Sequence, residues 1–85
     1  MQRNEMTTME KLSLGDRFYF ANDKKRLVWQ KVEHETTQTK YRTYKHFALL
    51  ASVVDNPCMK EEYKKNLTKA VNKDTAIVFL RRAAV

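Results

Sequence analysis

The stretch LSLGDRFYFANDKKRLVWQKV, residues 12–32, decides the fold of this chain. It contains two apolar runs, which are separated by a polar segment that begins at Asn22. Aromatic and β-branched side chains suit a pleated, half-buried surface, whereas Asn, Asp and Lys suit a turn. The stretch therefore predicts a β-hairpin with strands over residues 17–21 and 27–33.

The only glycine of the chain, Gly15, stands just before the first of these strands. Glycine adopts a positive φ without steric cost, so this position predicts a tight turn that leads into the strand. Side chains alternate between the two faces of a strand. We therefore expect Phe18 and Phe20 in the core, and Arg17 and Tyr19 on the opposite face.

The second strand is harder to orient, because each of its faces carries both apolar and polar side chains. Trp29 alternates with Lys31 and Glu33, whereas Val28 alternates with Val32. Charged side chains favour solvent. We therefore predict that the two valines point into the core and that Trp29 lies outward or at the rim.

Two further β segments are predicted downstream. In the first, residues 39–50 alternate between the two faces and begin with a cationic half. The second half of this segment, residues 47–54, is apolar on both faces and should be buried. Residues 75–80 form a last apolar run that is typical of a closing strand.

A helix is predicted between these segments. Asn56 suits the N-cap and Pro57 suits the first helical position. Apolar residues then recur at spacings of three and four positions as far as Val71. The pattern predicts one helix over about residues 57–71, with its lysines on the solvent side.

The length of 85 residues allows one small domain. We expect a flexible N-terminal arm over residues 1–10, one domain over residues 11–82 and a short tail over residues 83–85. The predicted fold is mainly β with one helix, as a strongly bent antiparallel sheet or open barrel of four to five strands.

The charge of the chain points to an anionic partner. Seventeen Lys and Arg residues against ten Asp and Glu residues give a formal net charge of +7. Such an excess attracts polyanions or an acidic protein surface. The single cysteine, Cys58, excludes an internal disulfide, and no apolar run is long enough to cross a bilayer. We expect a cytoplasmic protein without membrane contact.

Three short motifs resemble those of small SH3-like β-barrel proteins, including proteins of phages and mobile elements. They are the opening L-x-x-G-D-x-F-x-F of residues 12–20, the strand around Val28 and Trp29, and the closing D-T-x-I-x-F of residues 74–79. The predicted helix departs from a minimal barrel. The resemblance implies an SH3-like fold that binds nucleic acid in some members and protein in others, and fold alone does not choose between them.

Aromatic residues interleave with the cations, which is a pattern that favours nucleic-acid binding. Cations hold phosphates, and exposed rings offer planes on which bases stack. The alternative is that the lysines only keep the protein soluble and that Trp29 and Tyr41 are core residues. The candidate binding residues are Arg17, Tyr19, Trp29, Lys31, Lys40, Arg42, Tyr44 and Lys45.

Catalytic and metal-binding functions find little support in the sequence. His34 and His46 are the only imidazoles, and Cys58 has no second thiol. A metal requires three or four convergent ligands, and a cysteine nucleophile requires a base and a pocket. We therefore expect no enzyme activity, no cofactor and no metal.

The predicted function is that of a non-catalytic basic binding module, an accessory nucleic-acid-binding protein. The alternative is a protein-interaction module or a small phage-type inhibitor that recognises an acidic protein surface. The dependence of oligonucleotide binding on salt separates the two.

Overall fold

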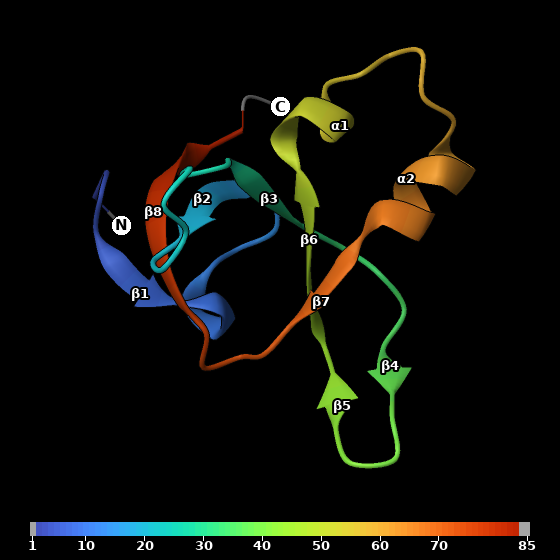
Figure 1. Cartoon of the computed structure of the whole chain (residues 1–85), viewed down its shortest axis with the longest axis horizontal. Helices are drawn as coiled ribbons and strands as arrows, with labels where there is room; N and C mark the ends of the chain where they lie inside the picture. Colours follow the sequence, from blue (N-terminus) through green and yellow to red (C-terminus); the bar gives the residue numbers. More distant parts are fainter. Residues whose placement is uncertain (1, 84–85) are drawn as a thin grey trace.

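The structure is a computed structural model that describes residues 2–83 of the chain. Most of its regular elements are β-strands, and its helices are short (Figure 1). The strands are β1 (Met6–Thr8), β2 (Asp16–Phe20), β3 (Trp29–Val32), β4 (Thr37–Gln38), β5 (Thr43–Tyr44), β6 (His46–Leu50), β7 (Lys69–Val71) and β8 (Ala76–Arg82). The helices are the 3₁₀ turn η1 (Met9–Lys11), α1 (Ala51–Val54) and α2 (Glu61–Leu67).

Six of the strands form one antiparallel sheet in the order β1-β8-β2-β3-β6-β7. β4 and β5 pair separately as a two-stranded hairpin between β3 and β6. Within residues 2–83 the sheet is open, with β1 and β7 as its edges. The prediction of a mainly antiparallel β fold is confirmed, but the main sheet has more strands than the four to five predicted.

The core lies on the face of the sheet where Phe18 of β2 stands opposite Trp29 of β3 and Phe79 of β8. Phe18 is fully buried, as predicted, and Phe20 and Trp29 pack against the same cluster. The buried members of this cluster are Met9, Leu12, Phe18, Ala48, Val71, Ile77 and Phe79.

The predicted orientation of the second strand is wrong. Trp29 packs against the core, Lys31 is buried, and Val28 and Val32 are only half-buried. The cause is that the Lys31 ammonium finds hydrogen-bond acceptors inside the protein, which the alternation of apolar and polar residues does not reveal.

The predicted flexible arm over residues 1–10 is also wrong over most of its length. Met6–Thr8 pairs with β8 as an edge strand, and Met9 is 0% exposed in the core. The pairing joins residues about seventy positions apart, so no local pattern announces it. Residue 1 lies outside the described residues. Residues 84 and 85, which belong to the predicted tail over residues 83–85, also lie outside them.

The predicted helix over residues 57–71 is shorter than expected. α2 covers only Glu61–Leu67, because Lys69–Val71 leaves the helix to pair with β6. Asn56 does not cap a helix at Pro57, because α2 begins only at Glu61 and has Lys60 as its N-cap. The Asn56 side-chain oxygen accepts a hydrogen bond from the Cys58 N–H at 3.0 Å without a helix following. This arrangement is a local turn.

The turn before β2 is built around the buried Lys31 side chain. The Lys31 Nζ atom donates hydrogen bonds to the carbonyl oxygens of Met9 (3.1 Å) and Leu12 (2.7 Å). Gly15 takes a φ of 92°, as predicted from its sequence position, and its N–H donates to the Lys31 carbonyl at 2.9 Å. Asp16 accepts a hydrogen bond from the Ser13 N–H at 2.9 Å. Lys31 thus fixes η1 and the turn to the sheet.

We predict that Lys31→Met destabilises the protein by about 2 kcal/mol, because two inward-facing carbonyl groups lose a charged donor. Urea unfolding monitored by circular dichroism measures the change. The matched control is Lys25→Met, since Lys25 is exposed in the β2–β3 loop. Equal stability of Lys31→Met and the unchanged protein would contradict this role of Lys31.

A basic cleft as the candidate functional site

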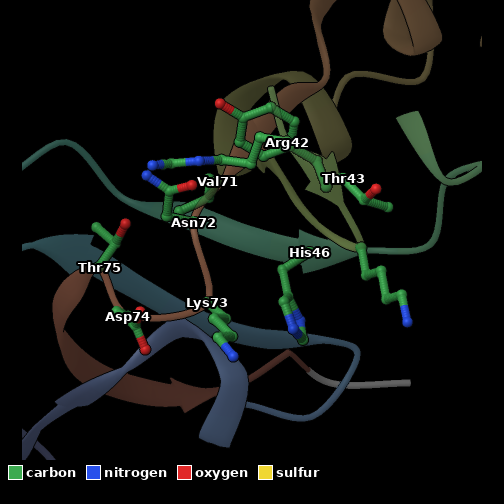
Figure 2. A pocket seen from close by; sticks show the side chains of 10 residues that line it. Arg42, Thr43, His46, Val71, Asn72, Lys73, Asp74 and Thr75 are labelled. Atoms are coloured by element: carbon green, nitrogen blue, oxygen red, sulfur yellow. The ribbon is translucent and has the colours of Figure 1, made fainter. Parts of the chain in front are cut away.

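A cleft of about 660 Å³ separates two walls of the protein (Figure 2). One wall is β5 with the first residue of β6, and the other is the turn from β7 to β8. The cleft is lined by Arg42, Thr43, Tyr44, Lys45, His46, Val71, Asn72, Lys73, Asp74 and Thr75.

The turn wall is held in place by η1. The N–H of Met9 donates to the Thr75 carbonyl and the N–H of Glu10 donates to the Lys73 carbonyl, both at 3.1 Å. Since Lys31 fixes η1 through the Met9 carbonyl, the same buried ammonium also supports this wall. The position of the turn therefore depends on contacts far from it in the sequence.

In the hairpin that forms the other wall, hydrogen bonds between Thr39 and Arg42 close the turn. The Thr39 N–H and hydroxyl both donate to the Arg42 carbonyl, at 2.7 and 3.0 Å, and the Arg42 N–H donates to the Thr39 hydroxyl oxygen at 3.1 Å. These bonds define the turn at the tip of the β4–β5 hairpin and so fix the position of the Arg42 backbone.

The cleft carries an excess of positive charge. Arg42, Lys45 and Lys73 line it, whereas Asp74 is its one carboxylate. In the described part of the chain, ion pairs join Arg17 to Asp55, Lys64 to Glu61 and Arg82 to Asp16, so none neutralises the three cleft cations. These cations are therefore available to an anion.

The side chains that line the cleft point in different directions. In Figure 2 the Arg42 side chain extends toward Asn72, whereas the His46 and Lys73 side chains both point away from Arg42. Thr43 points away from them. The lining thus contains two groups, the Arg42 guanidinium with the Asn72 amide, and the His46 imidazole with the Lys73 ammonium.

His46 feels this electrostatic environment. Burial, followed by the positive charge of Lys31, lowers the pKa of His46 below its usual range. Lys45 and Lys73 act in the same direction, whereas the Glu10 carboxylate opposes them. A bound anion would favour the protonated imidazole, so His46 is a natural reporter of the cleft.

The structure brings three of the predicted binding residues together in the cleft, namely Arg42, Tyr44 and Lys45. Lys40 lies nearby at the tip of the hairpin, where its Nζ atom is 5.6 Å from the centre of the Tyr41 ring. Whether these residues bind a ligand stays a prediction.

Arg17 and Tyr19 lie on β2 and do not line the cleft. The Arg17 guanidinium is bound bidentately to Asp55 at 2.7 and 3.1 Å, and its side chain is only 11% exposed. This hydrogen bond also lowers the pKa of Asp55. The Tyr19 ring has the Arg26 guanidinium 5.7 Å from its centre. Both residues already have partners within the chain.

Lys31 and Trp29 also lie apart from the cleft lining. Lys31 is 7% exposed and its ammonium donates to two backbone carbonyls inside the protein, so it is not placed to bind a phosphate. Trp29 packs on Phe20, with the Lys69 Nζ atom 5.7 Å from the centre of the Trp29 indole. The eight candidate residues therefore do not all lie on one face of the protein.

Sequence reasoning missed His46 and Lys73 as cleft residues. His46 alternates with Tyr44 along the chain, which is a weak signal that both share a face. Lys73 gives no such signal, because it is brought to the cleft by long-range contacts, namely the pairing of β7 with β6 and the hydrogen bonds from η1.

A second cleft, of about 600 Å³, lies beside α2. It is lined by Val32, Glu33, His34, Glu35, Leu49, Val54, Glu61, Lys64, Lys65 and Thr68. Its three glutamates offset its two lysines, so it lacks the excess of positive charge that marks the first cleft.

Two other kinds of site are absent from residues 2–83. No cluster of three or more His, Cys, Asp or Glu side chains there could hold a metal ion. No helix in the same range is long and apolar enough to span a membrane.

Comparison of the chain with models of protein families, with curated proteins and with solved structures finds no match. The resemblance to SH3-like barrels therefore stays a prediction.

We predict that the pKa of His46 lies below the ordinary value of 6.5 and responds to its neighbours in opposite directions. Lys45→Gln should raise it, because a repelling charge is lost, and Glu10→Gln should lower it. NMR titration of the imidazole signals measures both shifts. Shifts of the same sign in the two variants would refute the assigned environment.

The lowered pKa also has a consequence for stability. Between the ordinary pKa and the folded-state pKa, the unfolded chain binds more protons than the folded protein at His46. The contribution of His46 therefore makes the protein less stable as the pH falls from above 6.5 through the folded-state pKa. His46→Gln should reduce this part of the pH dependence in urea unfolding, and an unchanged pH dependence would contradict it.

Proposed function

We propose that the protein is a non-catalytic, basic binding module that acts as an accessory nucleic-acid-binding protein through the cleft between the β4–β5 hairpin and the β7–β8 turn. The observation that carries the proposal is that three cations, Arg42, Lys45 and Lys73, line one cleft and form no ion pair within residues 2–83. A phosphate backbone offers a row of negative charges to such a group.

The composition of the cleft also favours this function over the binding of a small anion. The cations of the cleft come from two separate segments of the chain, so a ligand that spans both walls meets all of them. Tyr44 adds an aromatic ring to the same lining. Proteins that bind a nucleic-acid strand commonly combine cationic side chains with aromatic rings.

The second candidate is recognition of an acidic protein surface. It is favoured by α2, on which Tyr63 and Leu67 are 60% and 52% exposed beside Lys64 and Lys65. Aromatic side chains are enriched in protein interfaces. In this alternative the lysines steer the partner and the apolar side chains hold it.

A salt titration tests the proposed function. Labelled random oligonucleotides, single-stranded and double-stranded, should bind at ~50 mM salt, and the affinity should fall linearly on a logarithmic plot as salt is raised. Fluorescence anisotropy measures this dependence. Failure of both kinds of oligonucleotide to bind at the low salt concentration would reject nucleic acid and favour the acidic protein.

The cleft itself is tested by the double variant Lys45→Ala/Lys73→Ala. Loss of two phosphate contacts should reduce the slope of the salt plot by about 1.5. The matched control is Lys24→Ala/Lys25→Ala, which removes the same charge from the exposed β2–β3 loop. Equal effects of the two double variants would show that the net charge, and not the cleft, governs binding.

A further inference from the structure

The most exposed large apolar side chain near the cleft is Tyr41, which is 88% exposed at the tip of the β4–β5 hairpin. The hairpin projects from the six-stranded sheet (Figure 1). The ring is therefore not one of the core residues that the sequence allowed as an alternative. An aromatic ring held in solvent by a well-defined turn is available to stack on a ligand.

The surroundings of Tyr41 match those of the cleft. Lys40 and Arg42 flank it in the sequence, and Arg42 is the first residue of the cleft lining along the chain. The Thr39 and Arg42 hydrogen bonds that close the turn also fix the step from Tyr41 to the cleft. Tyr41 thus directly precedes the first residue that lines the positively charged cleft.

We infer that the ligand is an unpaired polynucleotide strand and that Tyr41 stacks on one of its bases while the cleft cations hold its phosphates. The inference rests on the proposed function and adds to it the class of nucleic acid and a binding residue.

The shape of the site favours a single strand over a duplex. The cations lie inside a cleft of about 660 Å³, which accommodates a few groups of an extended strand, whereas a double helix is read by elements that protrude into its grooves. The hairpin does protrude, but the Arg42 side chain extends toward Asn72 across the cleft (Figure 2). Its charge is directed at the cleft interior.

The chemistry of Tyr41 leads to the same conclusion. In a duplex the base faces are covered by their neighbours, so an exposed ring gains a stacking partner only where bases are unpaired. The Lys40 Nζ atom lies 5.6 Å from the centre of the Tyr41 ring and supplies a cation for the adjoining phosphate.

The experiment compares three labelled ligands by fluorescence anisotropy at ~50 mM salt, where phosphate contacts are strongest. They are oligothymidylate, oligouridylate and a DNA duplex of matched length. The two single strands should bind more tightly than the duplex. Comparison of the DNA and RNA single strands shows which sugar the site prefers.

Three variants locate the stacking ring. Tyr41→Ala should weaken binding of the single strands roughly tenfold while leaving the slope of the salt plot unchanged, because a ring releases no counterions. Tyr41→Phe keeps the ring and should bind like the unchanged protein. Tyr63→Ala removes another exposed tyrosine, on α2, and should have no effect.

The outcomes separate the two proposals. Absence of binding to all three ligands would overturn the proposed function and this inference with it. Duplex binding that equals or exceeds single-strand binding would overturn the inference alone, and so would a Tyr41→Ala variant with unchanged affinity for the single strands.

Discussion

The architecture depends on one buried interaction, the pair of hydrogen bonds from the Lys31 ammonium to the carbonyl oxygens of Met9 and Leu12. Burial lowers the pKa of Lys31, and the nearby Asp16 carboxylate partly opposes this effect. An ammonium that leaves water requires acceptors inside the protein, so it can be accommodated only when η1 and the following turn close over it. With those segments in place, Met9 and Leu12 complete the core.

The candidate site is a consequence of the same constraint. Backbone N–H groups of η1 donate hydrogen bonds to the Lys73 and Thr75 carbonyls in the turn from β7 to β8. That β7–β8 turn forms one wall of the cleft. The other wall belongs to a hairpin that lies outside the main sheet and is set by its own turn. The cleft therefore lies between a turn that is anchored to the core and the projecting β4–β5 hairpin. This arrangement gives a ligand strand a fixed surface on one side and an aromatic tip on the other.

The sequence predicted what local patterns determine and missed what distant contacts determine. The β2 strand with its core residue Phe18, the turn at Gly15 and the closing strand β8 follow from alternation and turn chemistry. β1 was missed because its partner lies at the other end of the chain, and Lys31 was assigned to the surface because its acceptors are backbone atoms. At the site, the cationic segment that contains Arg42 could be predicted from interleaved charge and aromatic residues. The opposite wall could not, since it meets this segment only in the folded sheet.

Amide chemical-shift changes in the ¹⁵N-labelled protein, mapped as unlabelled oligothymidylate is added, show where the ligand binds. We expect the largest changes on residues 41–46 and 71–75, on both walls of the cleft, and little change on α2. Changes concentrated on α2, or on the face of the sheet that carries Arg17 and Tyr19, would contradict the claim that this cleft is where the protein meets its ligand.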